Sequence, residues 1–168
     1  MASRFPRHLV RLVWLAALLG VSSLARGTDL TVTTPDRTWV ITPSVWSGLP
    51  RMELVASDPH GGASHSYAGV SMRDLLLQAG APLGDKLRGP NLRTGVLIEA
   101  ADGYAVLYAL AEFDEAFSER RLLLADRKDG AALGESAAPF QLIVPGDKRG
   151  ARSIRQVKSI TLVQPAKP

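Results

Sequence analysis

The chain has 168 residues, a formal net charge of +4 and no cysteine. The lack of cysteine excludes disulfide bonds, thiolate metal sites, cysteine nucleophiles and iron–sulfur clusters. Four of the 20 bases and none of the 16 acids lie in residues 1–27, so the remainder carries 16 bases against 16 acids, and this neutrality argues against a nucleic-acid partner.

Residues 1–27 have the three regions of a secretory signal peptide. Three arginines in the first eleven residues precede an apolar run at 12–25, and small residues follow up to Gly27. The alternative is an uncleaved anchor, but the apolar run is shorter than the roughly 20 residues that a membrane span needs. The bases are not an adjacent Arg-Arg pair, so we expect Sec-type export to the periplasm or beyond, with no stable membrane anchor after cleavage.

The first half of the mature chain mixes short strands with short helices. The pattern predicts strands at 29–33, 38–41 and 51–57, a helical turn over 43–46, and a helix that Ser71 caps and Gly80 ends. Between them, residues 58–70 read as a loop rich in glycine and serine that holds His60 and His65. A metal site is one reading of these histidines. Solvated loop histidines are the other, and the spacing with no cysteine nearby favours them.

The second half is dominated by strands. Strands are predicted at 95–101, 104–110, 140–144 and 158–163, with another from residue 120 to the Asp129-Gly130 turn and a short acidic helix at 111–119. Strands without a regular alternation with helices predict an α+β fold. We therefore expect one strand-rich domain at 28–164 and a disordered tail at 165–168.

Several residues carry groups that acid–base catalysis uses, but none lies in a recognisable motif. No G-x-S-x-G elbow or catalytic triad is found. The candidate acids and bases are Asp102, Tyr104, Glu112, Asp114, Asp126 and Asp129. Aspartates before glycine in turns, and acids at a helix start, also have ordinary structural explanations.

A basic stretch lies near the C-terminus. Five bases fall within eleven residues: Lys148, Arg149, Arg152, Arg155 and Lys158. Two glycines in the same loop allow backbone amides to approach a ligand, and arginine binds phosphate or sulfate through paired hydrogen bonds. The other reading is a solvated face that protects the edge of the last strand. Composition alone leaves both open.

The C-terminal half resembles the molybdopterin-binding domain of the sulfite oxidase family. The resemblance rests on "DGYAVLYALAE" (102–112), "LLLADRKDGAAL" (122–133) and "PFQLIVPGDKRGARSIRQVKSI" (139–160), with weaker support from residues 67–82. It implies a single strand-rich α+β domain of the sulfite-oxidase type. It also implies that Arg152, Ser153 and Arg155 belong to a pocket for the phosphate of molybdopterin, with Lys148 and Arg149 in the loop beside them.

Three features depart from that family. In the family a cysteine thiolate binds molybdenum, and this chain has no cysteine. The family's His-Gly pair is replaced here by "SAAP" at 136–139. The family's holoenzymes are exported in the folded state, whereas the predicted signal peptide indicates unfolded export. We therefore expect a non-redox module that binds a phosphate-bearing anion, or an acidic partner protein, through the basic loop. The alternatives are a molybdopterin-dependent oxidoreductase with an oxygen ligand from Tyr104 or Asp102, and a purely structural role.

Overall fold

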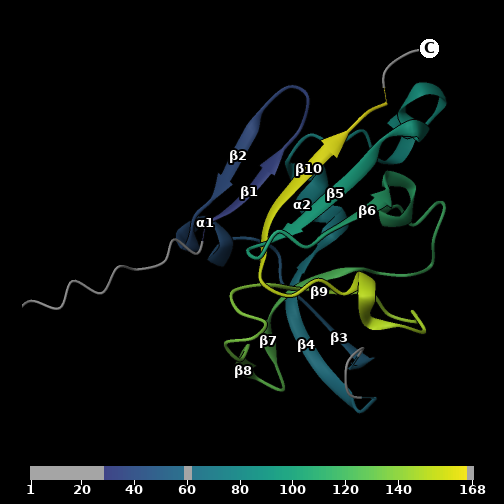
Figure 1. Cartoon of the computed structure of the whole chain (residues 1–168). Helices are drawn as coiled ribbons and strands as arrows, with labels where there is room; N and C mark the ends of the chain where they lie inside the picture. Colours follow the sequence, from purple (N-terminus) through teal and green to yellow (C-terminus); the bar gives the residue numbers. More distant parts are fainter. Residues whose placement is uncertain (1–28, 59–61, 166–168) are drawn as a thin grey trace, which may run out of the picture.

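Ten strands form most of the regular structure in residues 29–58 and 62–165, the part of the chain that this computed structural model describes (Figure 1). The strands are β1 (Leu30–Thr33), β2 (Thr38–Ile41), β3 (Met52–Ser57), β4 (Ser64–Ser71), β5 (Gly95–Ala100), β6 (Ala105–Ala109), β7 (Leu123–Lys128), β8 (Ala131–Ala132), β9 (Gln141–Ile143) and β10 (Val157–Val163). The helices are α1 (Pro43–Ser47) and α2 (Met72–Gln78), with 3-10 turns η1 (Gly84–Lys86), η2 (Gly89–Arg93), η3 (Leu110–Phe113) and η4 (Gly150–Arg152).

The first sheet joins the two ends of the domain. Its strand order is β2-β1-β10-β5-β6, in which β1 and β10 are parallel and the other neighbours are antiparallel. The last strand is thus central, although it ends the domain in sequence. The β5–β6 hairpin turns at Gly103, whose φ of 89° suits glycine. This turn and the segment that leads into β10 lie at the same end of the sheet.

The second sheet packs below the first (Figure 1) and has the order β3-β4-β7-β8, with β9 also paired to β7. Strand β4 pairs with β7, and the two backbones come very close together at Gly69. A Cβ atom at this position would lie 2.0 Å from the carbonyl oxygen of Leu124. Glycine therefore permits the close backbone approach of these two strands.

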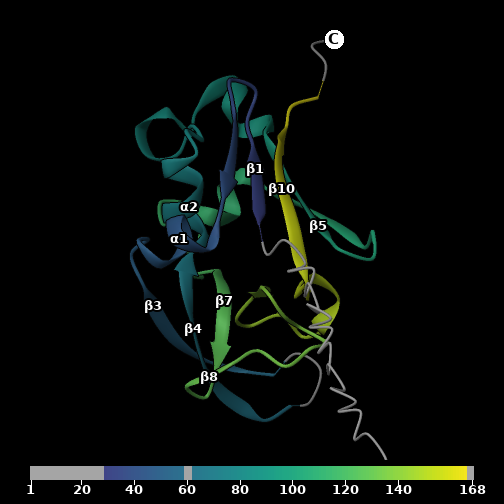
Figure 2. The same cartoon turned by 90° about the vertical axis from the view of Figure 1, so that its left-hand side faces the viewer.

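The main core lies between the first sheet and the helices. The alternating residues Leu30 and Val32 of β1 and Ile160 of β10 point inward and are fully buried. Helix α2 begins at its Ser71 cap, whose hydroxyl accepts from the Asp74 amide, and it buries Met72, Leu75 and Leu76. Figure 2 shows α1 and α2 together on one side of this sheet. A smaller core cluster lies at the second sheet.

The fold class predicted from sequence, a strand-rich α+β domain, is confirmed, but two elements were predicted wrongly. Residues 58–70 were expected in a loop, but residues 64–70 belong to β4, because pairing with β3 and β7 satisfies the backbone of this segment on both sides. The helix expected at 111–119 is only the turn η3. The buried Asp114 adopts an extended conformation there and its carboxylate accepts from the amides of Gly84 and Ala116, which ends the helix.

The predicted signal peptide at 1–27, His60, and the tail beyond Pro165 lie outside the described residues. Within the described ranges, no helix combines the length and the apolar character that crossing a membrane requires.

Candidate anion-binding site

The basic loop connects β9 to β10 and carries η4. Lys148 and Arg149 are exposed at its tip, and neither forms an ion pair with the described residues. The loop is anchored at η4 by two tyrosines from the hairpin of β5 and β6. The hydroxyl of Tyr104 donates to the carbonyl of Ala151 at 2.7 Å, and that of Tyr108 donates to the carbonyl of Arg152. These contacts hold the loop against β6.

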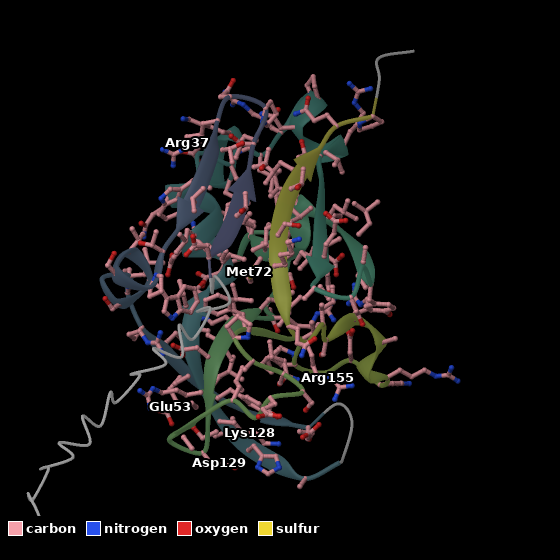
Figure 3. All side chains as sticks on the ribbon, turned by 60° about the vertical axis from the view of Figure 1, so that its left-hand side comes forward. Arg37, Glu53, Met72, Lys128, Asp129 and Arg155 are labelled. Atoms are coloured by element: carbon pink, nitrogen blue, oxygen red, sulfur yellow. The ribbon has the colours of Figure 1, made fainter. Side chains whose placement is uncertain are left out.

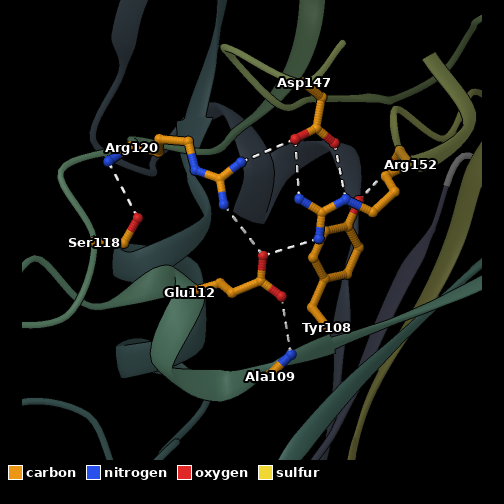
Figure 4. Close-up of polar contacts among 7 residues, drawn as sticks. All are labelled: Tyr108, Ala109, Glu112, Ser118, Arg120, Asp147 and Arg152. Carbon is orange, nitrogen blue, oxygen red and sulfur yellow. Dashed lines mark hydrogen bonds and ion pairs between the residues drawn. The ribbon is translucent and has the colours of Figure 1, made fainter. Parts of the chain in front are cut away.

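Arg152 lies inside a compact group of charges (Figure 4). Its Nε donates to Oδ2 of Asp147 at 2.8 Å, its Nη2 to Oδ1 at 3.0 Å, and its Nη1 to Oε2 of Glu112 at 2.9 Å. Arg120 contacts the same two carboxylates, at 2.9 Å from Asp147 and 3.5 Å from Glu112. The guanidinium of Arg152 also lies over the ring of Tyr108, 5.0 Å from its centroid. Two arginines thus balance two acids.

The charges in this group reinforce one another. The hydrogen bonds from Arg152 hold the pKa of Asp147 below its ordinary value, and the acceptance of these bonds by Asp147 and Glu112 raises the pKa of Arg152. Burial raises the pKa of Tyr108, so its hydroxyl stays protonated and remains a donor. Arg152 therefore has internal partners for Nε, Nη1 and Nη2, and its contacts fix the shape of the loop.

A hollow of about 300 Å³ opens beside η4. Ser153 and Arg155 line it from the segment after η4, and Asp102 and Tyr104 line it from the β5–β6 turn. Ser153 is only 3% exposed, and its hydroxyl has no hydrogen-bond partner among the described residues. Arg155 is exposed, and its guanidinium has no hydrogen bond or ion pair with them. Arg155 thus brings an unpaired positive charge to the hollow, and the wall beside it contains the buried Ser153 hydroxyl, which lacks a partner among the described residues.

The structure divides the residues that the sequence singled out as ligand-binding. Ser153 and Arg155 share the hollow, Arg152 lies in the charge group, and Lys148 and Arg149 lie at the exposed tip. Their binding of a ligand stays a prediction. Sequence reasoning missed Asp147 as the partner of Arg152, although an acid five residues away in one tight loop is a usable signal.

Most of the candidate acids and bases make structural contacts. Asp126 accepts a hydrogen bond from Trp46 and pairs with Arg51. Asp114 accepts from the Gly84 amide, and Glu112 pairs with Arg152. Asp129 accepts from His65 Nδ1 at 2.6 Å, so His65 belongs to a strand pair and not to a solvated loop. Asp102 and Tyr104 are the two candidates that line the hollow.

Comparisons with known proteins identify the fold. No family model and no curated protein matches the chain. Among solved structures, the chain is similar to the crystal structure of the sulfane dehydrogenase SoxCD from Paracoccus pantotrophus, with a TM-score of 0.61 and 19% sequence identity. The match covers 80% of this chain and 37% of that chain, so this protein spans little more than a third of the SoxCD chain. The resemblance to a sulfite-oxidase-type fold is thereby confirmed at the level of architecture.

The residues present do not fit a molybdenum centre of the thiolate type. The sequence offers no sulfur ligand from cysteine, and the described residues contain no group of three or more histidine, aspartate and glutamate side chains that could replace it. Of the oxygen donors in the hollow, the Tyr104 hydroxyl is bonded to Ala151, and the Asp102 carboxylate accepts from the Tyr104 amide at 2.9 Å.

Proposed function

We propose that this protein is an exported, non-redox module that binds a small oxyanion, such as phosphate or a phosphate ester, in the hollow between η4 and the β5–β6 turn. The observation that carries the proposal is the position of Arg155, which lacks a partner among the described residues and lines the same hollow as the buried, unbonded hydroxyl of Ser153. Export is supported by the sequence features of residues 1–27.

Charge and size both support an oxyanion. An unpaired guanidinium attracts an anion and can form two parallel hydrogen bonds with it, and the Ser153 hydroxyl can donate one more. A volume of about 300 Å³ is at the small end of ligand sites, which suits a small molecule better than a protein surface. The acidic partner protein expected as a second possibility would instead contact the exposed Lys148 and Arg149.

Asp102 refines the choice of anion. Its carboxylate lies on the wall of the same hollow and would repel most strongly a doubly charged ligand that carries no proton, such as sulfate. A ligand oxygen that keeps a proton can donate a hydrogen bond to this carboxylate. Inorganic phosphate has a P–OH group at neutral pH and sulfate has none. We therefore expect the site to prefer phosphate to sulfate.

Calorimetric titration of inorganic phosphate into the purified protein tests the proposal. The wild-type protein should bind saturably, and Arg155→Gln should weaken binding at least about tenfold, since a charge-assisted pair is lost. Arg88→Gln is the matched control because Arg88 is exposed near η2, at the other end of β5, and its side chain has no hydrogen bond or ion pair with the described residues. No saturable binding, or equal loss in both variants, would refute the proposal.

Elemental analysis separates this proposal from the molybdopterin alternative. Protein isolated from its own host should contain no stoichiometric molybdenum and no co-purifying pterin. A stoichiometric signal for both would favour an oxidoreductase with a non-cysteine ligand, and would reassign the hollow to that cofactor.

A further inference from the structure

A second hollow, of about 250 Å³, adjoins the first across Arg155. Arg155 and Ser136 line both hollows, so they form the boundary between them. The second hollow is also lined by Gln141 of β9 and by Lys128 of β7. Figure 3 shows Arg155 above Lys128, where the segment that leads into β10 passes over the second sheet. A ligand held by Arg155 can therefore extend to either side.

Gln141 is the unusual residue of the second hollow. It is only 5% exposed, and its side-chain amide makes no hydrogen bond with the described residues. Its backbone is used in pairing with Ala125 of β7, which fixes the position of the residue but leaves the amide free. The amide atoms of Gln141 are not among the fully buried groups that lack a partner, so they keep some exposure at the hollow that this residue lines. A ligand group that replaces water there could both donate a hydrogen bond to this amide and accept one from it.

The second hollow differs from the first in charge. Lys128 lies there but its Nζ pairs with Asp58 at 2.7 Å, so these two charges balance one another. The hydrogen bond that Lys128 donates to Asp58 raises the pKa of Lys128, which keeps the pair charged. Apart from Arg155 at the boundary, the side chain of the second hollow that we expect to recognise a ligand is therefore the neutral amide of Gln141. Neutral amides pair well with ligand groups that both donate and accept hydrogen bonds.

We propose that the natural ligand has two parts: an oxyanion that contacts Arg155 and Ser153, and a neutral amide-like group that hydrogen-bonds to Gln141. This inference rests on the proposed function, since it needs the anion to bind at Arg155. It narrows the ligand class from any small oxyanion to anions that carry a carboxamide, lactam or similar donor–acceptor edge. Ser136, exposed on the boundary, lies beside the path between the two parts.

Two matched carboxylates test the inference. Succinamate carries a carboxylate and a primary amide, and 4-oxopentanoate has the same length and the same carbonyl but a methyl group in place of the amide nitrogen. Wild-type protein should bind succinamate about threefold to tenfold more tightly, as expected for one neutral hydrogen bond. Gln141→Met keeps the length of the side chain, removes its amide, and should abolish this preference without weakening binding of inorganic phosphate.

The outcomes separate the two proposals. If phosphate binds and Arg155→Gln abolishes it, but the wild type does not distinguish the two carboxylates, the two-part ligand is wrong and the anion site stands. If Gln141→Met keeps the preference, Gln141 is not the group that recognises the amide, and the inference also fails. If neither phosphate nor succinamate binds, the proposed function itself is wrong. The comparison of the two carboxylates on the wild type needs no variant, so it holds even if Gln141→Met does not fold.

Discussion

Arg152 and Asp147 form a two-point ion pair within one loop, with Nε and Nη2 of the arginine donating to the two carboxylate oxygens at 2.8 and 3.0 Å. This pairing assigns different tasks to two arginines that lie three residues apart in the sequence. Arg152 stabilises the loop, and Arg155 remains available to a ligand. The predictions below separate these tasks by experiment.

The first prediction concerns stability at the charge group. Arg152→Gln should lower the free energy of unfolding by about 2 kcal/mol, because the substitution leaves the partly buried Asp147 and Glu112 without their main partner. Arg155→Gln should change it by less than about 0.5 kcal/mol, as is usual for exposed positions. Urea unfolding of both variants makes the comparison. Equal destabilisation by the two substitutions would contradict the assignment.

The second prediction concerns pH. The folded protein lowers the pKa of Asp147, so this residue contributes stability above its unfolded pKa of about 3.9, and the contribution is lost as the pH falls through the lower folded value. Asp147→Asn should therefore cost about 1 to 2 kcal/mol at pH 7. The difference from wild type should shrink in acid. Asp85→Asn, at an exposed position, is the matched control, and urea unfolding of both variants makes the comparison.

The third prediction concerns the choice between phosphate and sulfate. Asp102→Asn removes the carboxylate that would repel sulfate and supplies an amide donor in its place. Sulfate should then bind about tenfold more tightly than to wild type, while the preference for phosphate falls. Competition calorimetry with both ions measures this. If sulfate already binds the wild type as tightly as phosphate, Asp102 does not contribute to selectivity.

The fourth prediction concerns the close approach of β4 and β7. Gly69→Ala should destabilise the protein by more than about 3 kcal/mol, since its Cβ would collide with the Leu124 carbonyl and force the strands apart. Gly48→Ala is the matched control, because the nearest atom to its Cβ would lie at 3.5 Å, in ordinary contact. Thermal unfolding of both variants is sufficient. A stable Gly69→Ala protein would mean that β4 and β7 can move apart at this position without a loss of stability.

Sequence patterns predicted most strands because their residues alternate between the core and solvent. The alternation is seen in β1, where Leu30 and Val32 are buried. The helix was predicted from a different signal, its cap at Ser71, and is also confirmed. It failed for β4, whose three serines and one glycine are not typical of a strand, and which depends on pairing with two neighbouring strands. It also failed at 111–119, where the acidic pattern favoured a helix but the Asp114 carboxylate caps distant backbone amides instead.

The candidate site was only partly accessible from sequence. The cluster of bases was visible, and so was the place of Ser153 and Arg155 in the resemblance to the sulfite oxidase family. The contact of Arg152 with Glu112 was not visible, because these residues lie 40 positions apart in the chain. The role of Gln141 was also hidden, since a glutamine in an apolar strand gives no signal until the neighbouring hollow is known.

The most direct test of the central claim is a phosphate titration followed by two-dimensional amide NMR of the labelled protein. We predict saturable shifts at the residues that line the hollow, among them Gly150, Ser153, Arg155, Asp102 and Tyr104, with no comparable change near Arg88. Arg155→Gln should remove these shifts while leaving the rest of the spectrum intact. Shifts confined to Lys148 and Arg149, or shifts that never saturate, would mean that the basic loop attracts anions only as a charged surface, and would contradict the proposed binding site.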